Sequence, residues 1–66
     1  MKITLNGESR DLPEAATVTQ MLALLGYGER RVAVELNRAV VPKSRHASQV
    51  LADGDRIEII QAIGGG

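Results

Sequence analysis

The chain has 66 residues, of which 44% are hydrophobic and 24% charged, and eight Lys and Arg residues balance eight Asp and Glu residues. A domain of this size buries only about 60% of the surface of its unfolded chain, which leaves no room for an enzyme cleft of its own. The balanced charge and the single aromatic residue, Tyr27, argue against nucleic acid as a partner, and the absence of cysteine excludes disulfides and thiolate-held metal.

The first segment, residues 1–12, is predicted to form a β-hairpin. Apolar and polar residues alternate along Met1–Leu5, which is typical of a strand with one buried face. The dipeptide Asn6-Gly7 then favours a two-residue turn, because both residues accept positive φ angles. We therefore expect strand, turn and strand, with Pro13 interrupting the continuation of the second strand.

One short amphipathic helix is predicted after the hairpin. Thr17 and Gln20 have the spacing of a capping box, in which each side chain accepts a hydrogen bond from the backbone of the other residue. Apolar residues then recur at helical spacing, at Val18, Met21, Leu22 and Leu25. Gly26 provides a C-terminal stop for this helix.

The second half of the chain is predicted to contain two further strands and a short extended piece. Residues 30–37 alternate between apolar and polar, and residues 40–42 form an extended piece that ends at a proline. The polar stretch 43–51 is expected to be a connector with at most one helical turn, and residues 52–55 read as a tight turn. The final strand is expected within residues 56–63.

These elements predict an α+β domain in which one helix covers one face of a mixed sheet of four to five strands, in the order β-β-α-β-β. The first and last strands are rich in Ile, so we expect them side by side inside the sheet, and parallel because a helical crossover joins them. The expected core consists of Ile3, Leu5, Val18, Leu22, Leu25, Val34, Leu36, Ile57 and Ile59.

No residue within the chain is identified as a catalyst. The segment 26–28 lacks the third glycine of a nucleotide-binding loop and follows a predicted helix, so we interpret it as a helix end. His46 is the only histidine and has no acidic neighbour in sequence, so we expect a solvated loop residue and not a metal ligand. Residues 53–55 are explained by turn chemistry, although two flanking carboxylates also suit acid-base work.

The surface offers two kinds of contact candidate. Four basic residues stand in two local groups, Arg30, Arg31, Lys43 and Arg45, and are expected to be solvated, with docking on an acidic partner as the alternative. If Ile57 and Ile59 face the helix, Ile60 and Ala62 face away from it. Ile60 and Ala62 are therefore candidate partner contacts on an open sheet face.

The chain ends with Ile63 followed by Gly64, Gly65 and Gly66. A frayed end or a leftover linker is one interpretation. The other interpretation is a tail with a chemical function. Glycine lacks a Cβ, so the tail can enter a narrow channel of a partner enzyme with its carbonyl carbon open to attack. A carboxylate is a poor electrophile until its oxygen becomes a leaving group, so a partner enzyme would have to activate the Gly66 carboxylate.

Three stretches, MKITLNG, residues 36–60 and the terminal AIGGG, resemble the ThiS family of ubiquitin-like sulfur carrier proteins over essentially the whole chain. The resemblance implies a ubiquitin-like β-grasp domain at residues 1–62 and a flexible glycine tail at residues 63–66. It also implies that a ThiF-like enzyme uses ATP to adenylate the Gly66 carboxylate, which is then converted to a thiocarboxylate. Ile63, Gly64 and Gly65 would be recognised as the tail.

The resemblance further implies thiazole synthase (ThiG-like) as the sulfur acceptor in thiamin biosynthesis and a source such as a cysteine desulfurase, or glycine in some organisms. No cofactor is expected to be bound, and the free chain is expected to be a monomer. The alternatives are a carrier for molybdopterin synthase or cysteine biosynthesis, a modifier conjugated to lysines, or a plain binding module. No apolar run approaches the roughly 20 residues that span a bilayer and the N-terminus is too polar for a signal peptide, so we expect a cytoplasmic protein.

Overall fold

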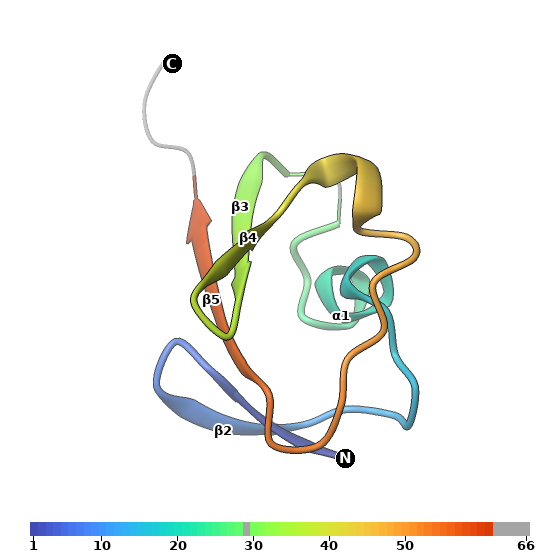
Figure 1. The fold of residues 1–66 in the computed structure, drawn as a ribbon, viewed down its shortest axis with the longest axis vertical. Helices are drawn as coiled ribbons and strands as arrows, with labels where there is room; N and C mark the ends of the chain where they lie inside the picture. Colours follow the sequence, from blue (N-terminus) through green and yellow to red (C-terminus); the bar gives the residue numbers. More distant parts are fainter. Residues whose placement is uncertain (29, 62–66) are drawn as a thin grey trace.

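Five strands and one α-helix form two layers in the computed structural model, which describes residues 1–28 and 30–61. The elements are β1 (Lys2–Leu5), β2 (Glu8–Asp11), α1 (Val18–Leu24), β3 (Val32–Leu36), β4 (Ala39–Val41), the 3-10 turn η1 (Lys43–Arg45) and β5 (Arg56–Gln61). Figure 1 shows α1 lying to one side of the sheet. The expected α+β architecture is confirmed, and η1 is the single helical turn expected in the connector.

The strand order in the sheet is β2-β1-β5-β3-β4. β1 and β5 are neighbours and run parallel, as the sequence predicts, and the other pairs are antiparallel. The extended piece expected at residues 40–42 is the strand β4, one residue earlier, which pairs with β3. The order is therefore β-β-α-β-β-β, with five strands.

Two hairpin turns share the same local chemistry. Asn6 and Gly7 join β1 to β2 with φ angles of 48° and 84°, as the sequence predicts. Asn37 and Arg38 join β3 to β4 with φ angles of 51° and 73°. Asparagine tolerates this left-handed region better than most residues, but Arg does not favour it, which explains why the sequence pattern did not reveal the second turn.

The ends of α1 follow the predicted capping pattern. Thr17 Oγ1 accepts a hydrogen bond from Gln20 N at 3.2 Å, and Gln20 Oε1 accepts one from Thr17 N at 2.8 Å. The helix ends at Leu24, and Gly26 then adopts a φ of 87°. Tyr27 N donates to Leu22 O at 2.9 Å, which closes the last turn. The interpretation of residues 26–28 as a helix end is confirmed.

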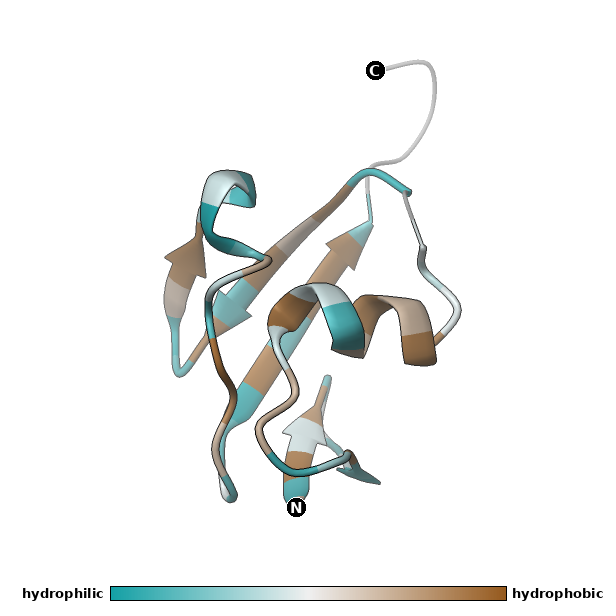
Figure 2. Ribbon diagram, turned by 90° about the vertical axis from the view of Figure 1, so that its right-hand side faces the viewer, coloured by the Kyte–Doolittle hydropathy of each residue, from teal (hydrophilic) through white to brown (hydrophobic). Residues whose placement is uncertain are grey.

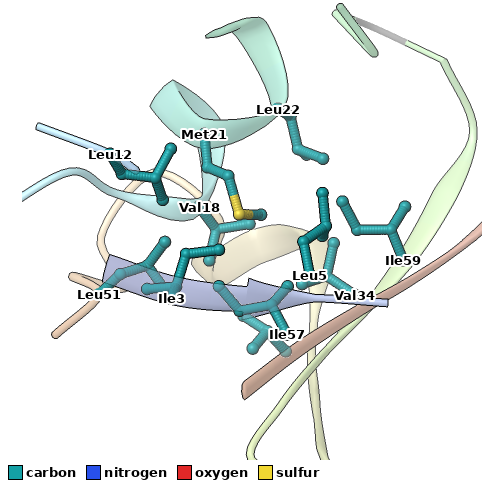
Figure 3. Close-up of a cluster of buried hydrophobic side chains, with 11 residues drawn as sticks. Ile3, Leu5, Leu12, Val18, Met21, Leu22, Val34, Leu51, Ile57 and Ile59 are labelled. Atoms are coloured by element: carbon teal, nitrogen blue, oxygen red, sulfur yellow. The ribbon is translucent and has the colours of Figure 1, made fainter. Parts of the chain in front are cut away.

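The core lies between α1 and the inner face of the sheet. Its buried members are Ile3, Leu5, Leu12, Val18, Met21, Leu22, Val34, Val41, Leu51, Ile57 and Ile59. Met21 and Leu22 point from the helix toward the strand residues (Figure 3), and hydrophilic and hydrophobic residues alternate along the first part of β5 (Figure 2). Leu25 and Leu36 were expected in the core but are only partly buried, because they lie at the ends of their elements and pack against its margin.

The prediction of a solvated loop position for His46 is wrong. Its side chain is buried, with 9% exposure, and Nε2 lies 3.1 Å from Val41 O. A carbonyl oxygen only accepts hydrogen bonds, so Nε2 is the donor. The backbone of His46 also accepts a hydrogen bond from Thr19 N at 3.0 Å. The connector therefore folds back onto the first turn of α1, an arrangement that its polar composition does not reveal.

The aspartates of the turn at residues 52–55 have structural partners. Asp53 Oδ1 accepts a hydrogen bond from Lys2 N at 2.7 Å, and Asp55 Oδ2 accepts one from Ala52 N at 2.7 Å. The first bond joins the turn before β5 to the start of β1, and the second closes the turn itself. The interpretation of residues 53–55 as turn chemistry is confirmed.

Candidate functional site

The candidate site begins where β5 ends, at Gln61. Gly66, proposed to carry sulfur, the tail residues Ile63, Gly64 and Gly65, and the candidate contact Ala62 lie outside the described residues. The boundary expected between a domain at residues 1–62 and a tail at residues 63–66 falls there too. The part of the site that the structure describes is the strand that leads into the tail and its surroundings.

β5 is fixed in the centre of the sheet up to its last residue. Ile57 and Ile59 are 0% and 7% exposed and anchor the strand to the core. Pairing with β1 covers only the start of the strand, ending at Ile57, whereas pairing with β3 continues to the pair Val32 and Gln61. The point from which residues 62–66 continue is therefore held by β3 alone.

Asn6 extends the support of β5 from the other side. Its backbone N donates to Ile57 O at 2.9 Å, and its Oδ1 accepts a hydrogen bond from Ile59 N at 2.9 Å. Its Nδ2 lies 3.4 Å from Ile59 O, at the long end of the hydrogen-bond range. The side chain thus takes the place of a further residue of β1. Sequence reasoning assigned Asn6 to the turn and missed this second role, which requires knowing that β1 and β5 are neighbours.

Ile60 lies on the outer face of the sheet, as predicted. Its side chain is 57% exposed, whereas Ile57 and Ile59 on the inner face are buried. It pairs across the strands with Ala33, which is also exposed. Val40 on β4 is 67% exposed. The outer face therefore presents Ile60 and Ala33 close to the end of β5, and Val40 two positions further along the ladder.

A groove of about 890 Å³ opens at the same end of the sheet. Apolar side chains from both layers line it, namely Leu22, Val32, Ala33 and Ile60. Arg30, Arg31 and Lys43 also line it, so the structure brings together three of the four basic residues singled out in the sequence. Arg45 is exposed on η1, the same turn that carries Lys43.

Neither a metal-ligand cluster nor a membrane-spanning helix is found in the part of the chain that the structure describes. Across residues 1–28 and 30–61, no group of three or more His, Asp or Glu side chains is placed to hold a metal ion. Within the same residues, no helix combines the length and the hydrophobicity needed to cross a bilayer. The site thus consists of the anchored end of β5, the apolar outer face and the basic groove.

Comparison with known proteins places this arrangement in a family. The sequence pattern of the ThiS family matches residues 3–66. The chain belongs to the ThiS family. The solved structure of the thiamine biosynthesis protein ThiS from Geobacter metallireducens matches with a TM-score of 0.86 and 32% identity, covering 100% of both chains. The expected β-grasp fold is confirmed by this match.

Relatives of this ThiS family chain occur both alone and within longer proteins. The sulfur carrier protein ThiS of Escherichia coli K12 is 30% identical over 66 residues, which cover 100% of both chains. Thiazole synthases of Paramagnetospirillum magneticum and Magnetococcus marinus are 47% and 42% identical over the same 66 residues. The chain spans only 20% of the length of each of these two proteins.

Proposed function

We propose that this chain is a sulfur carrier of thiamin biosynthesis and not itself an enzyme. The observation that carries the proposal is the match to the sulfur carrier protein ThiS of Escherichia coli over the full length of both chains. The family match extends to Gly66, so it includes the glycines to which the proposal assigns the chemistry. The anchored β5 supports the proposal, because it offers a fixed base for a reacting tail.

The proposed chemistry takes place at the Gly66 carboxylate. One of its oxygens attacks the α-phosphorus of ATP in a ThiF-like enzyme, pyrophosphate leaves, and an acyl-adenylate forms. A persulfide of the sulfur donor then attacks the carbonyl carbon, and AMP leaves to give an acyl disulfide. A thiol attacks the donor-side sulfur of this disulfide, the S–S bond breaks, and the products are a mixed disulfide on the donor and the Gly66 thiocarboxylate. Gly64 and Gly65 let the tail enter the narrow active site of the partner, since they present no side chain.

Thiazole synthase is the proposed acceptor of the sulfur. Two relatives that bear this name contain a segment similar to this chain within one longer polypeptide, which supports a functional link between the two parts. A cysteine desulfurase system is the proposed sulfur source. Because the reactions depend on ATP and on these enzymes, we propose that the chain acts in the cytoplasm.

Intact mass spectrometry tests the carrier chemistry. The chain is incubated with ATP, the ThiF-like enzyme of the same organism and a desulfurase system, and we expect a mass gain equal to the exchange of one oxygen for one sulfur. Deletion of Gly65 and Gly66 or addition of one Ala after Gly66 should prevent the gain, because small misplacements of a reacting group cost orders of magnitude in rate. Loading of either altered chain at the wild-type rate would refute the assignment to Gly66.

Ile60 is proposed to contact these partner enzymes through the outer face. Ile60→Asp should weaken binding to the ThiF-like enzyme or to thiazole synthase in calorimetric titrations, while its exposure keeps the effect on folding small. Leu24→Asp is a matched control, because Leu24 is 60% exposed but lies on α1, in the other layer. Equal affinities of wild type and Ile60→Asp for both enzymes would contradict the contact.

A further inference from the structure

We propose that the groove beside the end of β5 binds an acidic segment of the ThiF-like enzyme, and that this segment also carries an apolar anchor side chain. This inference rests on the proposed function for the identity of the partner. Ile60, the proposed outer-face contact, also lines this groove, and the new feature is its basic border of Arg30, Arg31 and Lys43.

The topology brings these basic residues together at the place where the tail begins. Arg30 and Arg31 directly precede β3, whose first residue, Val32, pairs with Gln61 at the end of β5. β4 runs antiparallel to β3 and ends at the pair of Val41 with Val34, so the turn η1 with Lys43 follows at the same end. In Figure 1, η1 and the start of β3 both lie toward the end of the sheet at which the arrowhead of β5 points.

The charge of the groove is not compensated by its described surroundings. Arg30, Arg31 and Lys43 are exposed, and the ion pairs found among residues 1–28 and 30–61 involve none of them. No Asp or Glu is among the described lining residues. The whole chain has a formal net charge of zero, but three positively charged side chains line this one groove. Such a concentration attracts negative groups and raises the rate of association.

The apolar part of the groove determines which acidic ligand fits best. Exposed Ala33 and Ile60 and half-buried Val32 offer carbon surface in the groove, with the buried Leu22 at its wall. β4 ends opposite Val34, so the edge of β3 at Val32 and Ala33 has no strand partner on that side in the described sheet. A nucleotide phosphate would gain little from the carbon surface, whereas a peptide with one apolar side chain and flanking carboxylates matches both features.

Charge reversal with a matched control tests the groove. Arg31→Glu/Lys43→Glu is compared with Lys2→Glu/Arg10→Glu, which changes the net charge equally but lies on the β1–β2 hairpin. Association with the ThiF-like enzyme is measured by stopped flow at low and high salt. We expect the groove variant to associate at least about tenfold more slowly at low salt and to lose salt dependence, while the control stays near wild type.

Crosslinking identifies the chemistry of the bound segment. A photoreactive amino acid replaces Ala47, which lines the groove and is exposed, in the carrier bound to the ThiF-like enzyme. Mass spectrometry should recover a partner peptide with an excess of Asp and Glu next to an apolar residue. A neutral or basic peptide would overturn the proposal, as would a groove variant that associates like wild type or a control that slows equally.

Different results would contradict the proposed carrier function and the proposed binding of an acidic segment in the groove. If the wild-type chain is not converted to the thiocarboxylate, the proposed function fails. If it is converted and the groove variant is adenylated and bound at wild-type rates, only the groove inference fails. Melting temperatures of all variants establish that each one is folded before these comparisons are made.

Discussion

At the scale of single residues, two asparagines connect hairpin turns to the central strand. Asn6 accepts a hydrogen bond from Ile59 N with its side-chain oxygen, and Asn37 accepts one from Arg56 N at 2.9 Å in the same way. Both residues also have positive φ angles. Asparagine can form the hydrogen bond to β5 and also adopt the turn conformation, because its side-chain amide bonds to backbone groups and its backbone tolerates the left-handed region.

Asn6→Gly should separate these two roles. Glycine accepts the φ of 48° without strain, so the loss isolates the side-chain hydrogen bonds to Ile59. We expect a decrease of about 1 to 3 kcal/mol in the free energy of unfolding, measured by urea denaturation. Arg38→Gly is the matched control at a φ of 73° and should leave stability unchanged or raise it. Equal effects of the two substitutions would show that the amide contributes nothing.

His46→Leu tests the buried histidine. The substitution removes the donor to Val41 O and leaves a buried carbonyl without this partner. Stability should fall by about 1 to 3 kcal/mol, whereas Ser44→Ala on the exposed side of η1 should have little effect. Chemical denaturation of both variants at neutral pH measures the difference. An unchanged midpoint for His46→Leu would mean that the Val41 carbonyl is satisfied in another way.

At the scale of elements, α1 depends on the sheet for its stability. It has seven residues, and isolated helices shorter than about 12 residues are marginal in water even with good caps. The capping box satisfies backbone groups at its start, but the burial of Val18, Met21 and Leu22 holds the helix in place. A substitution on the buried face therefore affects the whole domain.

Leu22→Ala should destabilise the domain strongly. Leu22 is 6% exposed, and truncation of a buried Leu costs about 2 to 5 kcal/mol, a large part of the stability of a small domain. Leu24→Ala provides the comparison, because Leu24 is 60% exposed and its truncation should cost less than about 0.5 kcal/mol. Thermal unfolding followed by circular dichroism measures both changes. Similar melting temperatures for the two variants would contradict the assigned helix face.

At the scale of the whole molecule, the fold separates stability from the proposed chemistry. The buried core found in residues 1–28 and 30–61 extends from Ile3 to Ile59, whereas the proposed chemistry is assigned to Gly66, which lies outside the described residues. One end of the sheet combines the end of β5, the exposed Ile60 and the basic groove. Partner recognition and the reacting tail are therefore proposed to lie at the same end.

Deletion of Gly65 and Gly66 should leave the melting temperature close to that of the full chain. The deletion removes no residue of the described core or sheet, and groups without buried contacts contribute little to stability. Calorimetry of both chains under identical conditions measures the effect. A large decrease would show that the terminal glycines contribute to folding, and the activity of the deleted chain would then no longer report on chemistry alone.

The sequence alone determined the local elements, because their signals are short-range. The alternation around Ile57 and Ile59, the Thr17–Gln20 capping box and the Asn6-Gly7 turn each depend on residues a few positions apart. The placement of Ile60 on the outer face followed from the same alternation. The parallel pairing of the first and last strands also followed, since a helical connection leaves few other topologies.

Only the tertiary structure decided which distant residues meet. His46 is buried because η1 folds over α1, and Asn6 bonds to β5 because β1 and β5 are adjacent. The groove exists because the segment before β3 and the turn after β4 converge at one end of the sheet. Local sequence patterns do not predict these contacts, because each contact joins segments that are far apart in the chain. Whether a side chain is buried, and whether like charges lie close together, depends on all the segments that surround that side chain in the folded protein.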